Sequence, residues 1–223
     1  MPDRAFVRPR SLAEQAAEQI RHRIVNGDFQ LGEALSETAL ASELGVSKTP
    51  IREAFLRLKT EGLVDVQPQR GTFVFQIDHD EARVLSDFRD VLEIAALRQT
   101  MRENAPGLAR LLKPIISEMK TVLARKDTRR YRALDDQFHR RLIDYCGNAY
   151  LSEAYATIAF RIQALRNRLS QDPRLNAKSL QEHQALVRLI ERGATSEAVG
   201  VLRRHIARTP KDYAKTLVAC CKK

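Results

Sequence analysis

The sequence predicts a mainly α-helical protein, with a small mixed N-terminal part followed by an all-helical antiparallel bundle. Three observations support this fold class. Only 6% of the 223 residues are aromatic and none is Trp, whereas strands favour aromatic and β-branched residues. Apolar residues recur at helical spacing through most of the chain. The alternation of apolar and polar residues that marks a half-buried strand is confined to one short N-terminal segment.

Three helices and a hairpin are predicted in the N-terminal part. Each helix begins after a serine, a preferred N-cap, and ends near a glycine, which tolerates the left-handed conformation common at helix C-termini. In "VDVQPQRGTFVFQI" apolar and polar residues alternate around Arg70-Gly71, as in a small hairpin. A helix, a helix-turn-helix and a hairpin in this order predict a winged helix-turn-helix. The expected helices cover residues 11–27, 36–45 and 47–62, with caps at Ser11, Ser36 and Ser47.

From Asp78 onward the apolar spacing stays close to that of a helix, and almost no strand signal remains. Glycine, proline and polar clusters interrupt the pattern, so about six helices joined by short loops are expected, as in an antiparallel bundle. The expected breaks lie at residues 104–107, 126–129, 147–148, 172–173 and 193.

Composition argues against several classes of protein. No apolar run reaches the roughly 20 residues that a membrane-spanning helix needs. The N-terminal "MPDRAFVRPR" lacks the apolar core of a secretory signal. The three cysteines show no redox or metal-ligand spacing such as Cys-x-x-Cys, which favours a reducing compartment. We therefore expect a cytoplasmic protein that has no membrane partner.

The formal net charge of +10 is unevenly distributed. Residues 1–76 contain ten Lys and Arg against ten Asp and Glu, so the remainder of the chain carries the whole excess. If the N-terminal part binds DNA, the local placement of charge must be the cause. The basic remainder is suited to an anionic small molecule.

The predicted helix-turn-helix would present several side chains suited to DNA. The N-terminal residues of the second helix in such a motif enter the major groove. Arg52 can bind a guanine through two hydrogen bonds, and Lys48 can reach a base or a phosphate. The alternative is a three-helix interaction module with a solvated basic face. The expected DNA contacts are Ser47, Lys48, Thr49, Arg52, Arg70 and Gly71.

Three of the five histidines lie among apolar residues of the predicted bundle helices, and the other two are expected on the surface. In "LDDQFHRRL", Asp135 and His139 are four residues apart and project from one helical face, with Asp136 as a competing neighbour. His183 and His205 lie in the last two predicted helices. Buried His and Asp side chains need partners, and three imidazoles with one carboxylate suit a divalent metal such as Zn, Ni or Mn. Each histidine could instead be satisfied separately.

The most specific segments of the N-terminal part are "LGVSKTPIREAFLRL", "EGLV" and "RGTFV". With them, residues 10–76 resemble the DNA-binding domain of the GntR family of bacterial transcription regulators. Thr38 stands where relatives often carry a DNA-contacting Arg, and Lys48 where Arg is more usual, so the resemblance does not define the operator sequence. The residues that match operator contacts of the family are Lys48, Thr49, Arg52, Arg70 and Gly71.

The helical part, residues 78–218, resembles the FCD effector-binding domain of the FadR subfamily. Many FCD domains hold a metal with an Asp, a His four residues later and two further His on the last two long helices. Asp135, His139, His183 and His205 match these positions one for one.

The resemblance also implies basic residues that face an effector. "FRDVLEIAA" matches an Arg-x-x-x-Glu feature of the first FCD helix and nominates Arg89, with Glu93 orienting it. Arg161, isolated in the apolar "ATIAFRIQAL", is a second candidate. Either side chain could instead extend from a core face to solvent.

The resemblance implies a homodimeric regulator that binds a palindromic double-stranded DNA operator and responds to a small organic acid near the metal. The implied domains are residues 1–76 for DNA binding, 77–80 as a coupling linker, and 81–223 for metal binding, effector binding and dimerisation. A metal sensor without organic effector is one alternative. A metalloenzyme with a DNA-binding head is another, but no nucleophile motif or phosphate loop is present, and Asp136 and Glu182 are expected to point away from the ligands. We therefore do not expect an enzyme.

Overall fold

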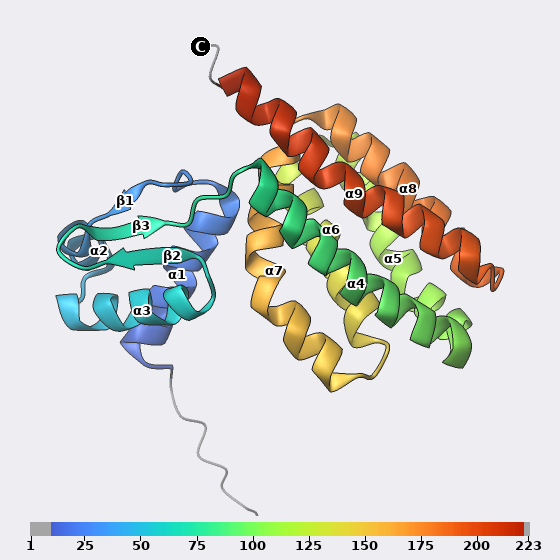
Figure 1. The fold of residues 1–223 in the computed structure, drawn as a ribbon, viewed down its shortest axis with the longest axis horizontal. Coiled ribbons are helices and arrows are strands. Elements are labelled where there is room, and N and C mark those ends of the chain that lie inside the picture. The colour runs from blue at the N-terminus through green and yellow to red at the C-terminus, as the bar shows by residue number, and fades with distance from the viewer. Residues whose placement is uncertain (1–9, 221–223) are drawn as a thin grey trace, which may run out of the picture. The chain divides into compact units, whose positions relative to one another are not determined.

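The computed structural model describes residues 10–220, with their side chains as far as Tyr213. The chain divides into two compact units between Gln76 and Ile77. Both units are mainly helical, and the described strands all lie in the first unit (Figure 1). In the described part of the chain no helix is long and apolar enough to cross a membrane.

The first unit contains three helices and a small sheet, as the sequence predicts. Ser11 and Glu14 form a capping box at the start of the first helix, and Gly27 ends that helix with a φ of 85°. Ile20 and Ile24 on its inner face are fully buried. The elements are α1 (Leu12–Asn26), β1 (Ala34–Leu35), α2 (Glu37–Leu44), α3 (Lys48–Thr60), β2 (Val64–Gln67) and β3 (Gly71–Val74).

The predicted cap of α3 is only half correct. Ser47 occupies the N-cap position with extended backbone, but its side chain makes no capping hydrogen bond. In α1 and α2 the cap serine accepts a hydrogen bond from the backbone N–H three residues later. The equivalent residue in α3 is Pro50, which has no N–H to donate. The hydroxyl of Ser47 therefore remains exposed at the start of α3.

The sheet has three antiparallel strands in the order β1-β3-β2. The predicted hairpin is the β2–β3 pair, which closes with Gln67 opposite Gly71. At its tip Gln69 and Gly71 have φ values of 64° and 111°. Strand β1 was not predicted, because a two-residue strand is too short to show an alternating pattern.

The described part of the second unit contains six helices, and the predicted breaks separate them. Within the predicted linker of residues 77–80, the Asp78 side chain accepts a hydrogen bond from the backbone N–H of Glu81 and caps a helix that starts at His79. The helices are α4 (His79–Glu103), α5 (Ala105–Ala124), α6 (Thr128–Asp144), α7 (Ala149–Leu169), α8 (Pro173–Glu191) and α9 (Thr195–Cys220).

Extensive helix-to-helix packing forms the core of the second unit. Helix α4 packs against α6, α7 and α9, while α5 packs against α6 and α8 (Figure 1). Large side chains such as Leu97, Leu112 and Phe138 are completely buried between these helices. Because α8 also packs against α9, the inner faces of α6, α8 and α9 meet in the interior.

Candidate metal centre and DNA-binding surface

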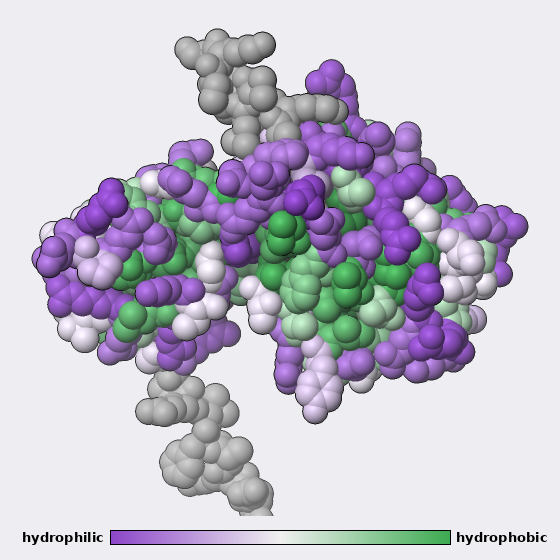
Figure 2. Space-filling view, in the orientation of Figure 1, coloured by the Kyte–Doolittle hydropathy of each residue, from purple (hydrophilic) through white to green (hydrophobic). Residues whose placement is uncertain are grey.

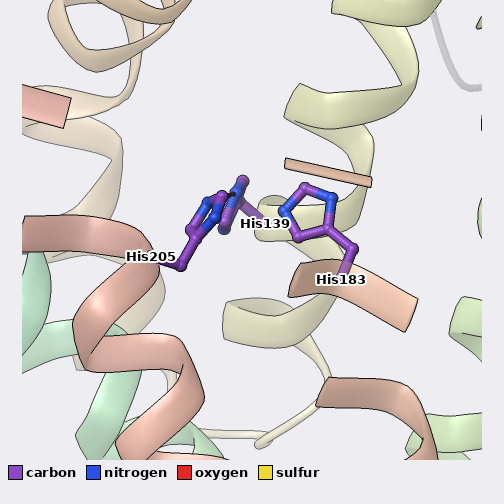
Figure 3. A group of neighbouring side chains, drawn as sticks. All are labelled: His139, His183 and His205. Carbon is purple, nitrogen blue, oxygen red and sulfur yellow. Dashed lines mark hydrogen bonds between the residues drawn. The ribbon is translucent and has the colours of Figure 1, made fainter. Parts of the chain in front are cut away.

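Three histidines from three helices meet inside the second unit. His139 of α6, His183 of α8 and His205 of α9 each offer one ring nitrogen, and these nitrogens lie within 4.8 Å of one another. Figure 3 shows the three imidazoles converging from their helices. All three side chains are buried. The structure therefore brings together the three histidines that the sequence nominated.

Helical periodicity explains why these histidines point inward. Each lies on the apolar face of its helix, close to buried Phe138, Leu186 or Leu202. The ring of Phe138 stacks on His183 with centroids 4.1 Å apart. Because these apolar neighbours are buried, the helix face that bears each histidine is turned towards the core.

Asp135 lies at the edge of the histidine cluster. Its Oδ1 is 3.9 Å from Nε2 of His183 and 3.4 Å from the hydroxyl of Ser179, which donates to it. The structure thus places the predicted carboxylate of α6 beside His183 of α8, and Asp135 lies about one helical turn from His139 on α6. Asp136, expected to face outward, instead forms ion pairs with Arg140 and Arg166.

Two glutamates that were not predicted to contact the histidines lie against the histidine cluster. Oε2 of Glu93 lies 2.9 Å from Nδ1 of His139, and Oε2 of Glu182 lies 2.7 Å from Nδ1 of His205. Glu182 was expected to point away from the metal ligands, and its contact with His205 shows that this expectation was wrong. No sequence signal identifies its contact with His205, because that contact depends on how α8 and α9 pack.

The electrostatic environment favours neutral imidazoles, which are the form that binds metals. Burial holds the pKa of His139 well below its usual value, and the nearby Arg89 and Arg166 act in the same direction. Burial likewise lowers the pKa of His183. For Asp135 burial acts to raise the pKa, but several opposing positive charges, the largest contribution coming from Arg166, together outweigh burial and lower the pKa overall. The site therefore combines a carboxylate with two imidazoles, those of His139 and His183, that stay uncharged.

The donor set fits a divalent metal. Neither ring nitrogen of His183 has a hydrogen-bond partner among the described residues, although the side chain is only 1% exposed. A buried polar atom without a partner is costly, so these nitrogens require a ligand that the chain itself does not supply. Imidazole and carboxylate donors suit Zn, Ni or Mn.

Two buried arginines lie against the cluster. Arg89 donates from Nε to Glu93 over 2.5 Å, and its Nη2 lies 3.1 Å from the ring nitrogens of His139. Arg166 of α7 donates to Asp136 over 3.0 Å. The Nη1 atom of each arginine has no hydrogen-bond partner in the described part of the chain. These orphaned cationic donors are suited to an added carboxylate.

Arg161, the second predicted effector-binding residue, has an ion-pair partner outside the histidine cluster. It forms an ion pair with Glu81 at the start of α4, and its side chain is 22% exposed. Arg166, which sequence reasoning missed, continues the buried stripe of Ile158 and Ile162 at four-residue intervals. That spacing is the signal that could have identified Arg166.

A small cavity adjoins the cluster. Its volume is about 40 Å³, and Asp135, Arg166 and His205 form part of its lining. Arg132 and Arg208 contribute further positive charge to the wall. Since one water needs about 10–15 Å³ by this measure, the cavity has room for only a few waters.

In the first unit, the predicted DNA-contacting residues are all exposed on the surface. Nε of Arg52 donates to Glu37 of α2 over 2.8 Å, and the Arg52 side chain is 64% exposed. Glu37 therefore holds Arg52 in the unbound protein and would have to release it to a base. The exposed residues are Ser47, Lys48, Thr49, Arg52, Arg70 and Gly71.

The remaining histidines do not belong to the cluster. His22 and His79 are exposed, as predicted. His79 lies beside Asp80, and His22 contacts the side chain of Asn26. Of the cysteines, Cys146 is buried with a free thiol; the side chains of Cys220 and Cys221 lie outside the described residues.

Comparison with known proteins identifies both units. Residues 12–74 match the family of bacterial regulatory proteins called gntR, and residues 84–208 match the FCD domain. The probable D-xylose utilization operon transcriptional repressor of Paenarthrobacter nicotinovorans is 28% identical over 88% of this chain and 86% of its own length. The gluconate operon transcriptional repressor of Bacillus licheniformis is 26% identical over 81% of this chain and 76% of its own length.

The fold has a close counterpart among solved structures. E. coli McbR/YncC superimposes with a TM-score of 0.79 over 94% of this chain and the whole of that chain, at 18% identity. This likeness supports the fold, while the two matched families cover most of the sequence. The chain therefore belongs to the GntR family of bacterial regulatory proteins and carries an FCD domain in its second unit.

Proposed function

We propose that this protein is a homodimeric, ligand-responsive transcriptional repressor that acts in the cytoplasm and binds a palindromic double-stranded DNA operator. Family membership supports the regulatory role, and the exposed Lys48 and Arg52 at the start of α3 support DNA recognition. A dimer would present two α3 helices to the two halves of the operator. The two relatives described above are both named as operon repressors, which supports the same sense of control here.

We further propose that Asp135, His139, His183 and His205 hold a divalent metal, with Zn, Ni and Mn as the candidates. The observation that carries this proposal is the convergence of three buried imidazoles, one of which has no hydrogen-bond partner among the described residues. Three imidazoles and one carboxylate leave coordination positions open on a metal that accepts more than four ligands, so a bound metal would supply attachment points for a carboxylate.

The proposed effector is a small organic acid. Its carboxylate would accept hydrogen bonds from Arg89 and Arg166, whose Nη1 atoms have no partner in the described part of the chain. Arg166 takes the role that the sequence suggested for Arg161. The present cavity of about 40 Å³ is smaller than such an acid, so binding must move side chains or helices that line the cavity. This movement would shift the balance between states that bind DNA and states that do not.

The size of the cavity favours one alternative, in which the protein senses the metal alone. A metal sensor without organic effector needs room only for the ion and a few waters, and about 40 Å³ is sufficient for that. In this alternative Arg89 and Arg166 would only balance the charge of Glu93, Asp135 and Asp136. We propose no catalytic activity for either version.

A melting experiment on metal-loaded protein separates the two versions. A ligand that binds the native state raises the melting temperature, so acetate, benzoate and gluconate serve as carboxylate probes of different size. The proposed regulator predicts that at least one acid raises the melting temperature of metal-loaded protein and changes its affinity for operator DNA. Operator affinity that responds to the metal alone and to no acid would support the metal sensor.

A further inference from the structure

A second cavity lies next to the one that adjoins the histidine cluster. Its volume is about 190 Å³, compared with about 40 Å³ for the cavity at the cluster. We call the smaller one the inner cavity and the larger one the outer cavity. The outer cavity lies where the end of α5 and the start of α6 approach the start of α8. Its wall includes Leu123, Thr128, Tyr131, Pro173 and Asn176.

The two cavities share part of their walls. Tyr131 of α6 and Asn176 of α8 line both of them, and both residues are buried. The Tyr131 hydroxyl donates a hydrogen bond to the backbone carbonyl of Asn176 over 2.8 Å. Burial and the nearby charge of Asp135 raise the pKa of this hydroxyl above its usual value, so it remains a neutral donor. A single hydrogen bond thus joins α6 to α8 where the two cavities meet.

The chemistry of the two cavities differs. The inner cavity is lined by Asp135 and Arg166, whose charges suit a metal and an added carboxylate. The wall of the outer cavity is mainly apolar, with Leu123 and Pro173 among its residues. Polar side chains cover much of the molecular surface seen in Figure 2, although apolar surface also gathers on the second unit. An apolar hollow beside a charged site suits a ligand with one charged end and one apolar end.

The dimensions define such a ligand further. An apolar cavity of about 150 Å³ can hold benzene, so the outer cavity of about 190 Å³ has room for a hydrocarbon ring. Tyr131 precedes Asp135 by four residues on α6, which is a rise of about 6 Å. A ligand whose carboxylate lies at the metal site therefore needs a spacer of several bonds before its apolar group can lie beyond Tyr131.

We propose that the effector is a carboxylic acid with a short spacer and an apolar tail, which occupies both cavities at once. Its carboxylate lies at the metal site beside Arg166, its spacer passes between Tyr131 and Asn176, and its tail fills the outer cavity. The Tyr131 side chain moves to let the tail pass, which removes a tie between α6 and α8. This inference rests on the proposed ligand-responsive regulator and names the class of its effector.

A series of acids tests the class of effector. Phenylacetate, phenylpropionate and phenylbutyrate carry the same ring on spacers of increasing length, while gluconate carries hydroxyl groups along its whole chain. Their affinities for the metal-loaded full chain would be measured by isothermal titration calorimetry. Phenylbutyrate should bind about tenfold or more tightly than acetate, because burial of an aromatic group of this size contributes about 1.5–3 kcal/mol. It should also bind more tightly than gluconate.

The position of the tail is tested by Leu123→Asp. A carboxylate in the wall of the outer cavity should weaken phenylbutyrate binding by about tenfold or more, because the tail loses an apolar contact and lies beside a charge. Acetate binding should not change, since acetate reaches only the inner cavity. The matched control is Leu111→Asp, which alters another half-buried leucine of α5 away from this wall and should leave both affinities unchanged.

The movement of Tyr131 is tested by Tyr131→Phe, which keeps the ring but loses the hydrogen bond to Asn176. Association of phenylbutyrate, followed by stopped-flow fluorescence, should become about 2- to 10-fold faster, as expected for the loss of one hydrogen bond. Tyr150→Phe, which changes a tyrosine that is 84% exposed, is the control. An unchanged rate in Tyr131→Phe would overturn the opening of the wall at this residue.

The outcomes separate this inference from the proposed regulator. Tighter binding of gluconate than of phenylbutyrate would overturn the apolar tail and leave an acid-responsive regulator in place. Phenylbutyrate binding that Leu123→Asp leaves intact, or an equal loss of acetate binding in this variant, would do the same. Circular dichroism would show that the variants keep their helices. If metal-loaded wild type bound none of these acids, the organic acid effector itself would be wrong.

Discussion

Oε2 of Glu182 lies 2.7 Å from Nδ1 of His205, and this contact directs the opposite nitrogen of the ring towards the histidine cluster. Nε2 of His205 is accordingly 3.3 Å from Nε2 of His139. Arg208 donates to the same oxygen of Glu182 over 2.7 Å, so the carboxylate is held from two sides. Against the opposing effect of burial, these hydrogen bonds lower the pKa of Glu182 to about 2. Glu182 therefore acts as a fixed acceptor that orients His205.

We predict that Glu182→Gln weakens metal binding by about 10- to 100-fold, since residues that orient metal-bound histidines have effects of this size. An amide can accept one hydrogen bond but no longer carries the charge that holds both His205 and Arg208. The affinity would be measured by competition with a coloured chelator. Glu197→Gln, an exposed change in the first turn of α9, is the control. Equal affinities of the two variants would show that Glu182 does not orient a metal ligand.

A second prediction distinguishes Arg166 from Arg161, which both lie on α7. Arg166→Lys keeps a positive charge beside Asp135 and Asp136 but loses the planar group that can bind a carboxylate with two hydrogen bonds. The affinity for the organic acid effector should fall by about tenfold or more, because hydrogen bonds to charged groups are worth about 1.5–3 kcal/mol. Arg161→Lys should leave it unchanged. Thermal titration of metal-loaded protein measures both, and the reverse order of effects would contradict the assignment of Arg166.

In the first unit, Arg52→Ala should weaken specific operator binding while the fold and the dimer persist. An arginine that binds a base through two hydrogen bonds contributes about 1–3 kcal/mol of discrimination, so specificity should fall by about 5- to 150-fold. Fluorescence anisotropy with an operator selected from a random DNA library gives the affinity. Arg57→Ala on the same helix, which removes an exposed ion pair with Glu14, is the control. Retained specificity in Arg52→Ala would mean that α3 is not the recognition helix.

The sequence predicts the helices well because their ends are marked locally. The side chains of Asn148 and Asp172 cap α7 and α8 by accepting hydrogen bonds from backbone N–H groups, and the breaks at these positions were predicted. The preference of serine for the N-cap position wrongly predicted a capping hydrogen bond at Ser47, because Pro50 has no N–H to donate to the Ser47 hydroxyl. Strand β1 was missed because its pairing with β3 depends on a partner distant in sequence.

The site was predicted only in part, because the sequence shows the apolar face of each helix but not the contacts between helices. His139, His183 and His205 could be nominated because each lies on the apolar face of a helix, and helical periodicity is visible in the sequence. The contacts of Glu93 with His139 and of Glu182 with His205 join different helices, so helix packing alone determines them. An arginine within an apolar run of sequence can be buried or can reach solvent. Arg161 and Arg166 lie on different sides of α7, and of the two Arg166 is the buried one.

The central claim is that Asp135, His139, His183 and His205 form one metal site. The most direct test is the metal content of purified chains, measured by plasma mass spectrometry after dialysis against Zn, Ni or Mn and then against metal-free buffer. Wild type and His79→Ala, which changes an exposed histidine, should retain about one ion per chain. His183→Ala, with its helical content verified by circular dichroism, should retain almost none. Full metal content in His183→Ala would contradict the account, because the four residues would then not be a single site.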